Sequence, residues 1–295
     1  MGKPGMESQR ADVKGSGSLA SFLKDHDVRA KKRLGQNFLV DGNILNRIVT
    51  SAGIGKEDTV LEIGPGTGNL TRHLCEAAGQ VYAFEIDEKL IPVLNDALKE
   101  YKNAEVINKD ILKVDLNEFI KEKDIRGSIK VTANLPYYIT TPILTGLLTS
   151  RLPIESITVM IQSEVAERMV SLPGKKTYGS LTLLVSYFSE PERVIEVPPS
   201  CFIPRPKVSS TVIKLNIRKE PPVLVKDEKL LFSIIRASFN QRRKTLYNGL
   251  KNSPEIKASP ESIAQAIESL GKSSTVRGEQ LSLKEFALLA DYLVK

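Results

Sequence analysis

Residues 59–68, Thr59-Val-Leu-Glu-Ile-Gly-Pro-Gly-Thr-Gly68, decide the fold class of this 295-residue chain. A β-branched, apolar run ends in three closely spaced glycines. Residues 69–78 then carry helix-forming side chains, with Leu70 and Leu74 at i, i+4 spacing. Glycines allow a sharp turn and a close approach of the backbone to a ligand. The stretch therefore predicts a strand, a ligand-binding turn and a helix.

The same alternation continues along the chain. Further strand-like runs cover residues 81–85, 104–108, 129–134 and 156–161, and helical spacing of apolar residues covers 88–101, 142–148 and 163–170. Strands that alternate with helices in this way indicate parallel β-α units and an open, doubly wound α/β sheet.

Two later strands break this pattern. Residues 194–197 and 210–215 are strand-like, and a proline-rich turn at 198–206 joins them without a helix. We expect them to form an antiparallel hairpin at the edge of the sheet.

The C-terminal part reads as all helix. Ser259-Pro260 precedes an apolar stripe that ends at Gly271, and Ser282-Leu-Lys-Glu285 is a capping box. With Lys219-Glu-Pro-Pro222 as a linker, we divide the chain into an α/β domain over 19–221 and a small helical domain over 222–295. Residues 1–18, rich in Gly, Ser and charge, are expected to be disordered or introduced by cloning.

Composition excludes several classes of protein. Two cysteines and two histidines make a disulfide scaffold, a metal site, a Cys-His pair or a Ser-His-Asp triad unexpected. No apolar run approaches the ~20 residues of a membrane span, and the N-terminus lacks the apolar segment of a secretory signal. The net charge of +7 indicates a polyanionic partner without identifying one.

Two acidic residues follow later strands at positions that suit a nucleotide. Glu85 lies 17 to 21 residues beyond the three glycines, where nucleotide-binding sheets place a ribose-binding carboxylate. Asp110, after the third strand, can accept a hydrogen bond from an exocyclic amine such as that of adenine. The spacing G-x-G-x-G is not the dinucleotide fingerprint. With Glu62 before it, the turn resembles motif I of S-adenosylmethionine-dependent methyltransferases, although Glu62 could equally brace the turn.

The fourth strand ends in Asn134-Leu-Pro-Tyr137, which resembles the motif of adenine- and cytosine-N4-directed methyltransferases. The adenine N6 lone pair is delocalised into the ring, so this amine is a poor nucleophile. Hydrogen bonds to the Asn134 side-chain oxygen and the Leu135 main-chain carbonyl would favour a tetrahedral nitrogen aimed at a sulfonium methyl group. Pro136 stiffens the turn, and Tyr137 can stack on an extruded base.

Two further segments narrow the resemblance. Lys31-Lys-Arg-Leu-Gly-Gln-Asn-Phe-Leu39 and Phe202-Ile-Pro-Arg-Pro-Lys-Val208 resemble those of the small-subunit ribosomal RNA adenine N6,N6-dimethyltransferase family. The resemblance implies a Rossmann-like class I methyltransferase sheet in the α/β domain and S-adenosylmethionine as cofactor. It also implies dimethylation of two adjacent adenines near the 3′ end of 16S rRNA in the assembling 30S subunit.

The resemblance assigns roles residue by residue. It places cofactor contacts on Asn37, Leu39, Gly64, Glu85, Asp110 and Asn134. It makes Phe202 the aromatic side chain that sandwiches the target base opposite Tyr137.

Basic residues cluster in acid-free windows near the proposed base site and in the helical domain. We expect RNA phosphates to be contacted by Arg205, Lys207, Arg236, Arg242, Arg243 and Lys244. If the helix there is continuous, Arg236 and Arg243 share one of its faces. We further expect a cytoplasmic monomer with no membrane association.

Two alternatives stay open on the sequence alone. One is the related 23S rRNA methyltransferase of macrolide resistance, which shares the fold and an Asn-x-Pro-Tyr/Phe motif. The other is a catalytically silent RNA-binding assembly factor on the same fold.

Overall fold

A twisted seven-stranded sheet forms the centre of the computed structural model, which describes residue 31 and residues 34–294. The strand order is β4-β3-β2-β5-β6-β9-β7. The bounds are β2 Thr59–Ile63, β3 Gln80–Phe84, β4 Ala104–Ile107, β5 Ile129–Asn134, β6 Ile154–Gln162, β7 Ser189–Val197 and β9 Ser210–Ile217. The predicted extension over 1–18 and the start of the predicted α/β domain at residue 19 lie outside the described residues.

Strand direction agrees with the sequence prediction. The five strands β2 to β6 pair in parallel, whereas β9 runs antiparallel to both β6 and β7. The predicted edge hairpin is therefore confirmed. The chain winds from β2 outward through β3 to β4 and then returns to β5 on the other side of β2. Such a switch point opens a crevice at the carboxyl ends of the neighbouring strands, which is where ligands bind in open α/β sheets.

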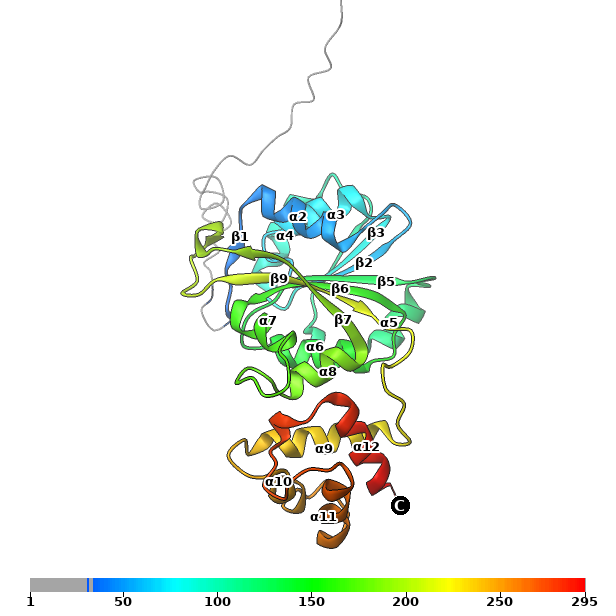
Figure 1. Ribbon diagram of the computed structural model, residues 1–295. Helices are drawn as coiled ribbons and strands as arrows, with labels where there is room; N and C mark the ends of the chain where they lie inside the picture. The colour runs from blue at the N-terminus through cyan, green and yellow to red at the C-terminus, as the bar shows by residue number, and fades with distance from the viewer. Residues whose placement is uncertain (1–30, 32–33, 295) are drawn as a thin grey trace, which may run out of the picture.

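Helices cover both faces of the sheet (Figure 1). One face carries α2 Gly42–Ala52, α3 Asn69–Ala77 and α4 Ile91–Leu98, and the other carries α5 Leu116–Glu122, α6 Thr140–Thr149, α7 Ser163–Met169 and α8 Ser180–Phe188. Short 3-10 helices lie at η2 Glu88–Leu90, η3 Ile111–Lys113, η4 Pro199–Cys201 and η5 Gly278–Gln280. None of the helices in the described ranges has the length and apolar content of a membrane span.

Helix α8 carries no amphipathic signal in the sequence. Seven of its nine residues are buried, because it lies between the sheet and the C-terminal helices. An apolar stripe at 3.6-residue spacing exists only where one face of a helix meets water. Periodicity therefore cannot identify this helix.

The C-terminal helices are α9 Glu228–Asn240, α10 Leu246–Lys251, α11 Pro260–Ser269 and α12 Leu283–Leu293. Both predicted caps are confirmed: Ser259 Oγ accepts the Ser262 N–H at 3.1 Å, and Ser282 Oγ accepts the Glu285 N–H at 3.3 Å. The condition under which Arg236 and Arg243 would share a helix face is not met, because α9 ends at Asn240 and an exposed turn follows.

The C-terminal helices pack directly beneath α8 (Figure 1). The Phe188 and Phe232 rings stack with centroids 5.5 Å apart, and the Tyr187 hydroxyl donates to Glu228 at 3.0 Å. One continuous cluster of buried apolar residues extends from this side of the sheet into α9–α12. The helical unit is thus anchored to the sheet layer by core packing.

A two-residue ladder completes the fold. Strand β1, Phe38–Leu39, pairs antiparallel with β8, Phe202–Ile203. It fastens the segment before α2 to the proline-rich turn of the edge hairpin. The segment around residue 38 is thereby held near the carboxyl end of the sheet (Figure 1).

Candidate active site

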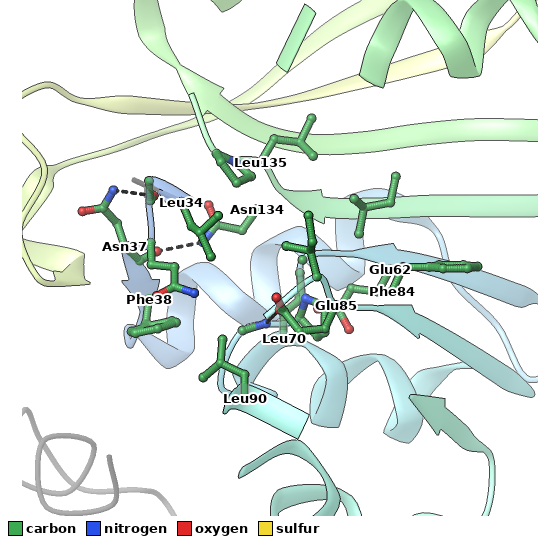
Figure 2. A pocket seen from close by; sticks show the side chains of 18 of the residues that line it. Leu34, Asn37, Phe38, Glu62, Leu70, Phe84, Glu85, Leu90, Asn134 and Leu135 are labelled. Carbon is green, nitrogen blue, oxygen red and sulfur yellow. Dashed lines mark hydrogen bonds between the residues drawn. The ribbon is translucent and has the colours of Figure 1, made fainter. Parts of the chain in front are cut away.

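A pocket lies at the switch point, where the carboxyl ends of β2, β3 and β5 meet. Its walls come from the turns after β2, β3, β4 and β5 and from residues 34–39 (Figure 2). The predicted residues that line it are Asn37, Leu39, Gly64, Glu85, Asp110, Asn134, Leu135, Pro136 and Tyr137. The structure therefore brings together side chains from five separate stretches of sequence.

The glycine turn adopts a conformation that other residues rarely reach. Gly64, Gly66 and Gly68 have φ of +72°, +61° and +80°, in the left-handed region. A Cβ on Gly66 would lie 3.1 Å from Cδ1 of Phe38, so the turn also needs the absence of a side chain there. The turn leads into the N-terminus of α3, where free N–H groups and the helix dipole favour a negative group.

Glu85 is positioned by backbone donors. Its Oε2 accepts the Gly66 N–H at 3.1 Å and its Oε1 accepts the Asp87 N–H at 2.8 Å. Burial raises the pKa of this carboxyl above its ordinary value. Each carboxylate oxygen has a second lone pair, so Glu85 can also accept hydroxyl hydrogens from a ligand in the pocket.

Glu62 is a buried acid at the end of β2, with 1% of its surface exposed. Its Oε2 makes no hydrogen bond within the described part of the chain, yet the residue lines the pocket. Burial raises its pKa to about 8, and the nearby Glu85 adds to the shift. An unpaired buried oxygen is costly unless a ligand or water supplies a donor.

Asn134 has its amide held from one side. Its Nδ2 donates to the Asn37 main-chain carbonyl at 3.1 Å, as Figure 2 shows. Among the described residues, no hydrogen bond uses Asn134 Oδ1 or the Leu135 carbonyl. Two acceptors from adjacent residues are therefore available at the pocket, as recognition of an exocyclic amine requires.

Two tyrosines, Tyr137 and Tyr138, follow Asn134, and they differ in hydrogen bonding and in exposure to solvent. The Tyr137 hydroxyl is hydrogen-bonded to Ser210 Oγ at 2.8 Å, and burial raises its pKa. Tyr138 also lines the pocket but is 57% exposed. Tyr138 was not among the predicted site residues, although it directly follows the Asn134-Leu-Pro-Tyr137 motif.

Comparison with known proteins decides the family. The sequence profile of the family described as ribosomal RNA adenine dimethylase matches residues 27–291. The chain is 57% identical over 264 residues to ribosomal RNA small subunit methyltransferase A of Lachnoclostridium phytofermentans, covering 89% of this chain and 91% of that protein. It is 48% identical over 285 residues to the protein of the same name from Geobacillus thermodenitrificans, covering 96% and 97%.

This chain belongs to the ribosomal RNA adenine dimethylase family.

Solved structures agree with this assignment. A dimethyladenosine transferase from Plasmodium falciparum superposes with a TM-score of 0.71 at 28% identity, covering 85% of this chain and 95% of that chain. The 23S rRNA methyltransferase ErmE superposes with a TM-score of 0.64 at 27% identity, covering 87% and 99%. The expected methyltransferase fold is confirmed.

The pocket of this dimethylase fits S-adenosylmethionine, the cofactor of its reaction. The orphaned oxygen of Glu62 suits a cationic group, and the α3 N-terminus suits a carboxylate. Glu85 suits ribose hydroxyls. Asp110, whose Oδ1 accepts the Leu112 N–H at 3.1 Å, suits the adenine amine.

Phe202, expected opposite Tyr137, is not among the residues that line the pocket. Its side chain is only 1% exposed and packs in the core with Leu39 and Met160, and it does not line the pocket. Pairing of β8 with β1 points the ring inward. The structure therefore brings Tyr137, but not Phe202, to the wall of the pocket.

The predicted RNA-contacting residues of the dimethylase fall into two groups. Arg236 pairs with Glu255 at 2.6 Å, and Arg242 pairs with Glu279 at 3.1 Å. Arg205, Lys207, Arg243 and Lys244 are exposed, and none of them forms an ion pair with another described residue. The second group is the better candidate for phosphate contacts.

Proposed function

We propose that this dimethylase transfers two methyl groups to N6 of each of two adjacent adenines near the 3′ end of 16S rRNA, while the small subunit assembles. It acts in the cytoplasm as a monomer. The residues that line the pocket have the cofactor and base contacts stated above, and the phosphate contacts come from Arg205, Lys207, Arg243 and Lys244. The observation that carries the proposal is the pair of free acceptors, Asn134 Oδ1 and the Leu135 carbonyl, beside a cofactor-shaped pocket.

These acceptors determine how the amine is activated. When bound, S-adenosylmethionine supplies an electrophilic methyl group. The two acceptors take hydrogen bonds from the two N6 hydrogens, which turns the nitrogen lone pair out of conjugation with the ring. The new N–C bond forms as the S–C bond breaks with its electron pair left on sulfur, and the methylated nitrogen, now cationic and acidic, releases one proton to water. A single N6 hydrogen then remains, so one acceptor suffices for the second transfer. The contribution of the protein is orientation and electrostatics rather than a strong base.

The division of labour along the chain belongs to the same proposal. Residues 19–221 bind the cofactor and the target base, and residues 222–295 contact folded RNA through Arg243 and Lys244. Arg205 and Lys207 contribute phosphate contacts from the proline-rich turn near the pocket. Core packing between α8 and α9 would hold the two parts in a constant orientation.

Primer extension across both large rRNAs tests the proposal. In a strain lacking this chain, the two adjacent 16S adenines should be unmodified, and expression of the chain should restore dimethylation. Modification of 23S rRNA alone would instead identify the enzyme as a 23S rRNA methyltransferase. The chain shares its fold with one such enzyme, ErmE. Binding of immature 30S particles without transfer of labelled methyl groups would indicate an assembly factor.

A further inference from the structure

Asp87 is a buried carboxylate two residues beyond Glu85, with 4% of its surface exposed. Its Oδ1 accepts Lys31 Nζ at 2.6 Å, and its Oδ2 accepts Gln36 Nε2 at 2.9 Å. We call these three residues the Asp87 cluster. Asp87 itself does not line the pocket, so its role is not direct contact with a ligand there.

The cluster fastens the segment that precedes β1. The Lys31 backbone N–H donates to Gln36 Oε1 at 2.7 Å, and the Leu34 N–H donates to the Lys31 carbonyl at 3.0 Å. Two side chains that precede β1, those of Lys31 and Gln36, are thus attached to Asp87. The next residue, Asn37, holds the Asn134 amide through its main-chain carbonyl.

Electrostatics favour a permanently charged anchor. Burial alone would raise the pKa of Asp87, but the hydrogen bonds from Lys31 and Gln36 bring it below its ordinary value. A charged, fully bonded carboxylate holds its partners more tightly than a neutral hydrogen bond does. Leaving such a group unpaired is strongly unfavourable, which disfavours detachment of the segment.

We propose that Asp87 is a positioning residue for methyl transfer. By holding Lys31 and Gln36, it fixes the Asn37 carbonyl, and this carbonyl turns the Asn134 amide so that Oδ1 faces the reacting amine. The inference rests on the proposed role of Asn134. It adds a chain of contacts that runs from the end of β3, through the segment before β1, to the end of β5.

The variant Asp87→Asn tests this series of contacts directly. An amide has one acceptor oxygen and no charge, so it cannot hold both Lys31 and Gln36. With undermethylated small-subunit particles and saturating cofactor, the single-turnover rate constant should fall about 10- to 100-fold, the scale of a displacement near 1 Å at a reacting centre. Amide hydrogen exchange of residues 34–39 should accelerate in the free protein. The hydrogen bond from the backbone N–H of residue 87 to Glu85 remains in this variant, so Glu85 stays in position. Cofactor affinity measured by calorimetry should therefore change less than the transfer rate.

Asp58→Asn is the matched control. Asp58 is also a largely buried carboxylate with a lysine partner, Lys130 Nζ at 2.8 Å, but it precedes β2 and so lies at the opposite end of the strands. Both variants should lower the melting temperature. Only Asp87→Asn should lower the transfer rate, because a merely structural role would affect the two alike.

Lys31 variants provide an independent readout if Asp87→Asn folds poorly. Lys31→Met should reproduce the rate loss, Lys31→Arg should restore most of the rate, and the double variant Lys31→Met/Asp87→Asn should be no slower than the worse single variant. A wild-type rate in both Asp87→Asn and Lys31→Met, beside an inactive Asn134→Ala, would overturn the inference while leaving the proposed function intact. An active Asn134→Ala would instead refute the role of Asn134, and this inference with it.

Discussion

Asn134 shows how one side chain can be oriented before substrate arrives. Its nitrogen is engaged by the Asn37 carbonyl, so its oxygen is directed elsewhere. An amide that populated two flipped orientations would present its acceptor oxygen to the substrate for only part of the time. Here the main-chain carbonyl of Asn37 selects one orientation by accepting a hydrogen bond from the amide nitrogen.

Replacement of Asn134 by Ala should therefore remove methyl transfer rather than binding. Loss of one oriented group of this kind costs about 100- to 1000-fold in rate. Transfer of labelled methyl groups to undermethylated 30S particles measures the rate, and calorimetry measures cofactor affinity, which we expect to stay measurable. Asn103→Ala is the control, because its amide also donates to backbone carbonyls, of Cys75 and Ala78, but it precedes β4, away from the pocket. Near wild-type turnover in Asn134→Ala would contradict its role.

Glu62 predicts a pH dependence of stability in the cofactor-free protein. Its pKa of about 8 in the folded state lies above its ordinary value of 4.5, so the folded state binds more protons between these limits. The contribution of Glu62 to stability is therefore complete below about pH 4.5 and declines as the pH rises toward 8. Denaturant unfolding at several pH values should show a smaller decline over this window in Glu62→Gln. An identical pH profile in the two proteins would mean that Glu62 is charged in the pocket.

At the scale of elements, the β2–α3 turn illustrates what glycine provides. All three of its glycines have positive φ, but only Gly66 also faces a ring at contact distance. Positive φ and crowding coincide at Gly66, which donates to Glu85, and also at Gly68, where an added Cβ would lie 3.3 Å from Leu94 Cδ2.

Gly66→Ala should lower both stability and cofactor affinity. A left-handed alanine costs on the order of 1 kcal/mol or more in unfolding free energy, and Phe38 must also move. Gly127→Ala separates the two effects, because Gly127 has φ of +86° with no atom within 4 Å of the added Cβ. Thermal unfolding should detect both substitutions, whereas calorimetry should show weaker cofactor binding only for Gly66→Ala. Equal affinity in both variants would exclude the turn from the cofactor site.

Elements were predictable where a short run of strand-forming residues or a helix cap marks them in the sequence. Strand β5 has the predicted bounds, and the Ser259 and Ser282 caps mark α11 and α12 correctly. The end of α9 was not predictable, because Gln241-Arg-Arg-Lys244 contains no glycine or proline to stop a helix. In the structure the turn after α9 is held by tertiary contacts, including the hydrogen bond from Arg242 to the Tyr178 carbonyl at 3.1 Å.

For the whole molecule, the charge of +7 matters through its distribution. Arg243 and Lys244 project from the turn between α9 and α10, exposed and without an ion-pair partner in the described part of the chain. Arg242 is instead tied to Glu279 and to the Tyr178 carbonyl. It is therefore better suited to shape the turn than to bind phosphate.

The double variant Arg243→Gln/Lys244→Gln should weaken binding to 30S particles and reduce its salt dependence. Loss of two phosphate contacts makes the negative slope of log K against log salt shallower by roughly 1.4 to 1.8. Filter binding over a range of salt concentrations measures this slope. The control variant Lys99→Gln/Lys102→Gln removes the same charge just after α4, at the end of this helix away from the pocket. It should leave the slope unchanged. An equal reduction in both double variants would show a general charge effect and not a contact.

The sequence by itself determined the strands β2 to β6 and their alternation with helices, the glycine turn, the carboxylates after β3 and β4, and the Asn134 motif, because each is a local pattern. Only the tertiary structure decided which distant residues meet: Asn37 with Asn134, 97 positions apart, and Lys31 with Asp87, 56 apart. It also turned Phe202 into the core and buried α8 on almost all sides. The spacing of apolar residues along the sequence shows which face of a helix or strand is buried. Which residues that face contacts depends on the strand order, in particular on the reversal between β2 and β5.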